Sequence, residues 1–152
     1  MHIDLVRYMD HHIVDILDQG VRASDEEEVH LATGYSCGIV LPEFVKVSEE
    51  VYTVLGGGVP IALYGVAPFK DKDTGSPWLI GTDKFSEYQI AIALWSREAV
   101  KDLKKKYRLL ENFVYNNNKR SIKWLQWCGF VIEEPEPFGP FGALFRRFWM
   151  KG

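Results

Sequence analysis

The chain has 152 residues, of which 47% are hydrophobic and 26% are charged, proportions that fit one globular domain with a buried core. The formal net charge of -3 argues against a dedicated nucleic-acid binder, and no apolar run approaches the ~18 residues of a membrane span. We therefore expect a single domain over residues 1–152, soluble and cytoplasmic, without a signal peptide.

The N-terminal third is predicted to hold one strand and three helices. Residues 2–8 alternate between apolar and polar side chains as a strand does, and Asp10 caps a helix that stops at Gly20. Ser24, with a glutamate three positions on, forms a capping box for the second helix. Pro42 opens a third, short helix.

A β-rich block follows. Residues 51–55 and 59–66 flank a run of three glycines and predict a hairpin. Residues 69–77 are polar and predict a turn, after which 77–83 form a third strand of the same meander. The pattern of 84–95 fits either a strand or a helix and leaves that segment open.

The second half is predicted to contain a helix, a strand, another helix and a closing hairpin. In order, these are residues 96–107, 109–115, 118–128, and the pair 130–134 and 143–150. Ser96 caps the first helix and Gly129 ends the second. The whole order predicts an α+β fold with a mixed sheet of about seven strands flanked by helices.

This order resembles that of the GCN5-related N-acetyltransferase (GNAT) superfamily. The resemblance is most specific near the end of the chain, where Asn118 is followed by Ser121 and then by a helix ending in Gly129 and Phe130. That arrangement is similar to the superfamily's late motif, which precedes its sixth strand. The element order covers nearly the whole chain, whereas the motif covers about 20 residues.

The sequence of residues 116–132, together with the sequences of 77–83 and 145–150, looks most like the divergent acetyltransferase-like proteins of tailed phages. One branch of those proteins consists of small internal virion proteins. The resemblance therefore implies either a phage-type enzyme or a virion or host-interaction protein.

In the superfamily, acetyl-CoA lies between the fourth and fifth strands, with its pyrophosphate on amides at the start of the next helix. The usual Arg/Gln-x-x-Gly-x-Gly/Ala signature is absent here, and IAIALWSREA stands in its place. A helix starting at Ser96 would offer a hydroxyl, amides and the Arg97 cation instead. The residues assigned to acetyl-CoA are Ile80, Gly81, Thr82, Leu94, Trp95, Ser96, Arg97, Asn118 and Ser121.

The catalytic groups are less well marked. Leu125 occupies the position where many relatives carry a tyrosine that protonates the leaving thiolate, and leucine has no proton to donate. A carboxylate or histidine would deprotonate the acceptor amine. The candidates for this base are Asp83, Glu87, His30 and Glu28. Each of them is also explained as a solvated charge or a helix cap.

No metal site is predicted. Neighbouring His11 and His12 diverge by roughly 100° on a helix, and Cys37 and Cys128 form neither a metal pair nor a disulfide framework. The basic residues 104–106 and 119–123 read as solvated helix faces, or as one strip that attracts CoA phosphates, nucleic acid or an acidic partner. Aromatic residues near the C-terminus suit a homodimer through sheet edges or simple burial.

Two functions stay open. The first is an N-acyltransferase that moves an acyl group, acetyl by preference, from acetyl-CoA to an unknown amine by direct attack. The second is a non-catalytic protein that keeps the fold as a phage virion or host-interaction protein and has lost cofactor binding. The altered loop and Leu125 favour the second, and the frequency of enzymes in the superfamily favours the first.

Overall fold

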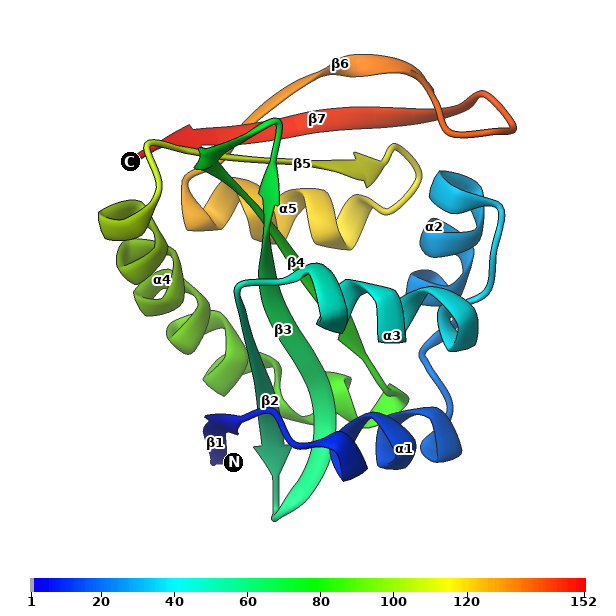
Figure 1. Cartoon of the computed structure of the whole chain (residues 1–152), viewed down its shortest axis with the longest axis vertical. Helices are drawn as coiled ribbons and strands as arrows, with labels where there is room; N and C mark the ends of the chain where they lie inside the picture. Colours follow the sequence, from blue (N-terminus) through cyan, green and yellow to red (C-terminus); the bar gives the residue numbers. More distant parts are fainter. Residues whose placement is uncertain (1) are drawn as a thin grey trace.

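The computed structural model describes residues 2–152 as one mixed β-sheet with helices on both faces (Figure 1). The strands are β1 (Ile3–Arg7), β2 (Glu50–Gly56), β3 (Val59–Phe69), β4 (Asp71–Gly81), β5 (Leu109–Tyr115), β6 (Val131–Phe138) and β7 (Ala143–Lys151). The helices are α1 (Asp10–Gln19), α2 (Ala23–Thr33), α3 (Cys37–Val47), α4 (Gln89–Lys106) and α5 (Lys119–Cys128), with a 3-10 helix η1 (Asp83–Tyr88) before α4. The predicted α+β class and seven-stranded mixed sheet are confirmed.

The strand order is β1-β2-β3-β4-β5-β7-β6. β1 to β4 form an antiparallel meander, β4 and β5 run parallel, and β7 lies antiparallel between β5 and β6. Beyond their short parallel contact β4 and β5 diverge, so the sheet is split like a V between its two halves (Figure 1).

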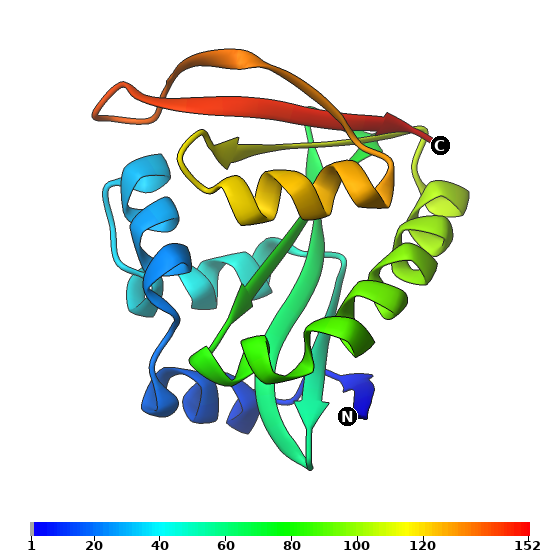
Figure 2. The same ribbon diagram turned by 180° about the vertical axis from the view of Figure 1, so that it is seen from behind.

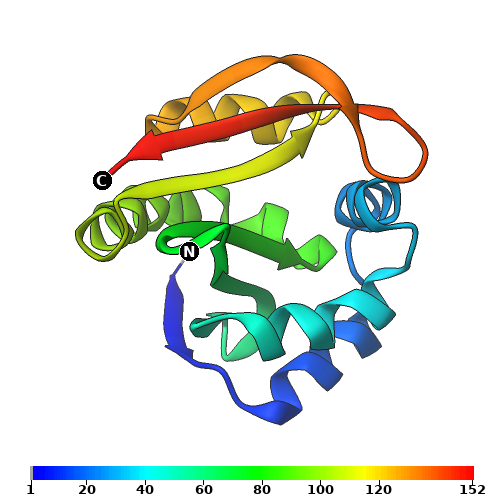
Figure 3. The same ribbon diagram turned by 45° about the horizontal axis from the view of Figure 1, so that its top comes forward.

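The helices are distributed around this split. α4 and α5 lie on one face of the sheet (Figure 2), and α1 and α3 lie on the other. α2 stands at the open end of the split, between the two halves (Figure 3). Within the described chain, no helix is both long and apolar enough to cross a membrane.

Each face of the sheet has its own core. Leu103, Leu110 and Ile122 bring α4, β5 and α5 together on one face. Ile16, Leu41 and Leu63 do the same for α1, α3 and β3 on the other. All of these side chains are at most 5% exposed, so both halves are held by burial of apolar surface. The split between them is therefore kept open by packing on its two sides.

Several predicted elements are confirmed by their local geometry. Gly57 and Gly58 have φ of 58° and 80°, the conformation of a two-residue hairpin turn that non-glycine residues rarely adopt. Strand 109–115 has the predicted bounds. Asn118 caps α5 by accepting a hydrogen bond from the Ser121 N–H at 3.4 Å, and Gly129 ends the helix in the left-handed region.

Other boundaries were wrong. The polar segment predicted as a turn is mostly strand, because Ser76 and Gly75 pair with β3, and the reversal occurs at Lys70 with φ of 68°. Pro42 lies inside α3 instead of opening it. The N-cap of α2 is Arg22 without a side-chain cap, so the capping box at Ser24 does not form.

The start of α4 is the correction that matters most for the site. Ser96 does not cap a helix: α4 begins at Gln89, and Ser96 lies in its middle and is 4% exposed. Its hydroxyl donates to the carbonyl of Ala93 at 2.7 Å, as serines inside helices do. The helix extends back because Ile92, four residues before Ser96, is buried on the same face.

Candidate functional site

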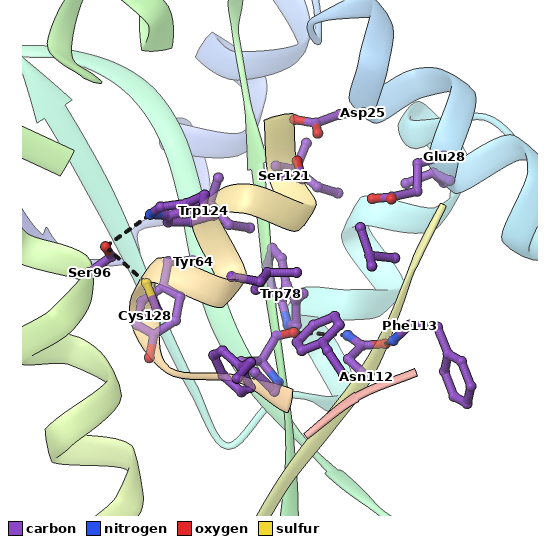
Figure 4. Close-up of a pocket in the computed structure, with 18 of the residues that line it drawn as sticks. Asp25, Glu28, Tyr64, Trp78, Ser96, Asn112, Phe113, Ser121, Trp124 and Cys128 are labelled. Carbon is purple, nitrogen blue, oxygen red and sulfur yellow. Dashed lines mark hydrogen bonds between the residues drawn. The ribbon is translucent and has the colours of Figure 1, made fainter. Parts of the chain in front are cut away.

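The split in the sheet contains a cavity of about 330 Å³. β4 and β5 pair only at Thr74–Leu109 and Gly75–Leu110, after which their facing edges separate. The space is lined from one face by α4 and α5 and from the other by α2 and aromatic residues of the sheet (Figure 4). Residues from both faces of the sheet therefore line one cavity.

The edge of β4 that faces the cavity is defined by the alternation of its hydrogen bonds. The Thr82 N–H donates to the Ile61 carbonyl of β3 at 2.9 Å. The backbone N–H and C=O groups of Thr82 and Ile80 therefore point toward β3. The backbone N–H and C=O groups of Leu79 and Gly81 point to the opposite edge of β4, into the split. Gly81 is already engaged there, whereas the backbone of Leu79 lies beside the cavity.

α2 closes the open end of the split with two carboxylates. The Gly81 N–H of β4 donates to Asp25 Oδ2 at 2.8 Å, and the Tyr115 N–H of β5 donates to Glu28 Oε1 at 2.7 Å. Because they are three residues apart on a helix, both side chains leave α2 on one face. In Figure 4 they project into the space between α2 and α5.

The two carboxylates differ in their electrostatic surroundings. Asp25 is 4% exposed and accepts a hydrogen bond from Arg22 Nε at 2.6 Å. Burial raises the pKa of Asp25, and the charge of Arg22 opposes that shift. Arg22 also stacks on the ring of Phe85, with its guanidinium carbon 4.3 Å from the ring centroid. Arg22 and Asp25 thus neutralise each other.

In the part of the chain that the structure describes, no cation forms an ion pair with Glu28, although the Arg22 charge lies close enough to oppose the rise of its pKa. Burial raises the pKa of Glu28 to about 7, and the neighbouring Asp25 charge adds to the rise, while the hydrogen bond from the Tyr115 N–H opposes it. A carboxyl group with a pKa near neutrality exchanges protons readily at physiological pH, which is the property of a general base. Among the cavity's carboxylates, Glu28 is the one suited to proton transfer.

The opposite wall carries a hydrogen-bonded cluster centred on Ser96. Trp124 Nε1–H donates to Ser96 Oγ at 3.0 Å, and the Cys128 thiol donates to the same oxygen at 3.4 Å. Because the Ser96 hydroxyl donates its hydrogen bond to the Ala93 carbonyl and the Cys128 thiol donates to Ser96, neither residue has a free donor for the cavity. Burial raises the pKa of the Cys128 thiol, which keeps it protonated.

A second cavity, of about 400 Å³, lies at the end of β4. Its lining includes the first residues of α2 (Ala23 and Ser24), the first residue of α4 (Gln89) and the first turn of α5 (Arg120 and Ser121). The N-termini of α2 and α5 therefore meet there with the positive ends of their helix dipoles, while α4 continues from η1 without a break. Such a convergence favours a bound anion.

The two cavities adjoin one another. Arg22, Ser121 and Trp124 line both of them. A ligand with an anionic group among the helix starts can therefore extend past Trp124 into the split of the sheet.

Solved structures of other proteins have the same architecture as this chain. A GNAT family acetyltransferase from Elizabethkingia anophelis with acetyl-CoA bound has a TM-score of 0.63 at 18% identity, over 99% of this chain and 98% of that chain. A Bacillus subtilis acetyltransferase in complex with CoA has a TM-score of 0.66 at 18% identity, with the same coverage. A GNAT family acetyltransferase from Streptococcus pneumoniae has a TM-score of 0.68 at 14% identity, over 99% of both chains.

The chain has the GNAT acetyltransferase fold. At these identities the likeness extends to the fold and not to the chemistry. No protein-family model and no curated protein sequence matches the chain.

The predicted cofactor residues are scattered in this structure. The Gly81 N–H faces the split but is bonded to Asp25, and the N–H groups of Thr82 and Ile80 face β3, so none of the three amides is free for a ligand. Leu94 is 65% exposed and does not line either cavity. Residues that do line the cavities are Ile80, Trp95 and Ser96 in the first, Thr82 and Asn118 in the second, and Ser121 in both.

Arg97 does not lie at a helix start. It belongs to the third turn of α4, where it stacks on Trp127 at 3.5 Å and donates to the Trp127 carbonyl at 3.1 Å. The physical reason for placing an anion at Ser96 and Arg97, a helix N-terminus, is therefore absent. The helix starts that favour an anion are those of α2 and α5, at Ala23 and Lys119.

The four candidate bases are separated by the fold. Glu28 lines the first cavity and Asp83 lines the second. Glu87 is exposed on η1. His30 is exposed on α2, with its ring 5.1 Å from that of Phe141. Among residues 2–152, no group of three or more His, Cys, Asp or Glu side chains is arranged to hold a metal ion.

Three residues of the site were missed from the sequence: Arg22, Asp25 and Trp78. Asp25 had a usable signal, because its spacing of three from Glu28 places both on one helix face. The other two carry no local signal, since their roles depend on β4 and η1 coming together with α2. Arg120 was named only within the basic strip, and it lines the second cavity.

Proposed function

We propose that this protein is an acyl-CoA-dependent N-acyltransferase. The observation that carries the proposal is the cavity in the split between β4 and β5, which is lined by residues from both faces of the sheet and holds one carboxylate with a pKa of about 7. Two substrates that approach from opposite faces would meet inside it. Holding two reactants in line supplies a large part of the rate of a bimolecular reaction.

The acyl-CoA would enter from the face covered by α4 and α5. Its pyrophosphate suits the second cavity, where the starts of α2 and α5 converge and Arg120 adds a cation. The pantetheine arm would then run past Trp124 into the split. The backbone of Leu79 is the free part of the β4 edge there. We assign to it the backbone hydrogen bonds with acyl-CoA for which Ile80 to Thr82 were first chosen.

Glu28 is the proposed general base. An acceptor ammonium would lose one proton to the Glu28 carboxylate and attack the thioester carbonyl carbon as a neutral amine. The carbon–nitrogen bond forms, the carbon–sulfur bond breaks, and CoA leaves as a thiolate. The second proton of the amine, released as the amide forms, ends on the thiolate. The products are an N-acyl amine and CoA.

This route does not depend on a tyrosine at position 125. Leu125 lines the first cavity and offers no proton. A thiolate is a good leaving group because its conjugate acid has a pKa of about 8.5. The amine's own proton is then sufficient to neutralise it.

Thermal denaturation with and without acetyl-CoA tests the proposal. A ligand present at 100 times its dissociation constant adds about 2.7 kcal/mol to the free energy of unfolding. We expect a rise in Tm with acetyl-CoA or CoA, and release of free thiol when an amine is also present. Absence of a shift at millimolar acetyl-CoA contradicts the proposal.

A non-catalytic role is the second candidate. It is favoured by the engagement of Gly81, whose N–H and carbonyl are bonded to Asp25 and to the Arg22 N–H, so part of the β4 edge is closed to a ligand. The resemblance of residues 116–132 to phage proteins would make this a virion or host-interaction protein. Thermal denaturation with acetyl-CoA also separates the two candidates, since only the enzyme responds to acetyl-CoA.

A further inference from the structure

We propose that the acceptor is a compact primary amine with an apolar, aromatic body and no anionic group, and that its ammonium pairs with Glu28. This rests on the proposed acyl transfer and adds the substrate class to it. It is carried by the α2 side of the first cavity, opposite the side assigned to the acyl-CoA.

The walls on this side are aromatic. Phe44 and Trp78 pack with ring centroids 5.6 Å apart, and Phe113 stacks on Phe138 at 4.4 Å. All four residues line the cavity, and Trp78 and Phe113 are visible beside it in Figure 4. An aromatic or aliphatic body gains free energy by leaving water for such a surface, at about 25 cal/mol per Å². A polar body would lose its hydration without replacement.

The charges on this side select for a cation. Arg22, Asp25 and Glu28 are the charged residues that line the cavity. Arg22 is committed to Asp25 and to the ring of Phe85, which leaves Glu28 as the group without a counterion. An ammonium supplies the missing charge.

The same charges exclude an anionic acceptor. The carboxylate of an amino acid would lie near Asp25 and Glu28 without a free cation to pair with it. An unpaired charge in an apolar cavity is strongly unfavourable. Discrimination between an amine and the corresponding amino acid should therefore be large.

The turn between β6 and β7 directly follows Phe138, the residue of β6 that lines this side of the cavity, so the turn would limit the size of the acceptor. This turn lies against the end of α2 (Figure 3), and a Cβ at Gly139 would stand 2.4 Å from the Leu31 carbonyl oxygen. Pro140 and Phe141 also contact the end of α2, at Gly34 and His30. A polypeptide tail carrying lysine would have to pass this contact, whereas a compact amine fits inside it.

The test compares ligands that differ by one group. Binding of 2-phenylethylamine and of L-phenylalanine to the protein without acetyl-CoA is measured by calorimetry, and transfer is then measured as thiol release with acetyl-CoA. Spermidine and a lysine-containing peptide are the other acceptors. We expect 2-phenylethylamine to exceed phenylalanine in kcat/KM by about 100-fold or more, the scale set by leaving a buried charge unpaired.

Variants check that Glu28 is the partner. E28Q should weaken the binding of 2-phenylethylamine by tenfold or more, and E27Q, an exposed neighbour on the same helix, should not. Equal use of phenylalanine, faster use of the peptide, or unchanged binding in E28Q overturns the proposal. Transfer to spermidine or the peptide alone overturns it while the acyltransferase function stands. A protein that binds no acetyl-CoA refutes that function, and amine binding by calorimetry still decides the acceptor class.

Discussion

Replacing Glu28 with glutamine should have opposite effects on activity and stability. Gln keeps a carbonyl oxygen for the Tyr115 N–H but carries no charge and cannot act as a base. Loss of a general base typically costs about 10²–10⁴ in rate. The folded protein, in contrast, no longer holds a carboxylate in a poorly solvated cavity.

The size of the stability effect follows from the pKa of Glu28. Folding raises it from 4.5 to about 7, and each unit corresponds to about 1.36 kcal/mol, so the ionised group opposes folding by on the order of 3 kcal/mol. A group whose pKa rises on folding destabilises the fold increasingly as pH climbs from its unfolded value to its folded value. The penalty is absent below pH 4.5 and complete above pH 7.

The assay is chemical denaturation of wild type, E28Q and the control E27Q at pH 5 and pH 8. We expect E28Q to be more stable than wild type at pH 8, by up to ~3 kcal/mol, and nearly equal to it at pH 5. E27Q should match wild type at both. If E28Q loses activity and is also less stable at pH 8, Glu28 holds α2 to β5 and the reasoning about its buried charge is refuted.

Three further outcomes are expected. The value of kcat/KM should rise tenfold per pH unit below pH 7 and level off above it, because the Glu28 base must be ionised; a profile flat from pH 5.5 to 8.5 contradicts this assignment. R120E should raise the KM for acetyl-CoA by about 10-fold or more with little change in kcat, and R97E should not, since Arg97 is bound to Trp127; the reverse result would return the pyrophosphate to Arg97. G65A should cost about 1–3 kcal/mol and raise the KM for the amine, because a Cβ there would lie 2.5 Å from Trp78 and push that ring toward the cavity; unchanged stability and KM would show that Trp78 is free to move.

Local patterns in the sequence were sufficient for much of the fold. The strand at 109–115, the helix over 118–128 with its stop at Gly129, and the glycine hairpin were predicted correctly because each depends on neighbouring residues. The order of elements and the class of fold followed from them. Glu28 was also among the predicted bases, although nothing in the sequence separated it from Asp83, Glu87 and His30.

The site itself was decided by tertiary structure. Ser96 has the local pattern of a helix cap, but burial of Ile92 extends α4 back to Gln89 and moves the free amides away from it. Asp25 and Glu28 meet Gly81 and Tyr115 across 56 and 87 residues of chain. Contacts over such separations leave no periodic trace in a sequence, because they depend on how far β4 and β5 diverge. Only the folded chain brings one carboxylate, without a counterion, into the cavity between those strands.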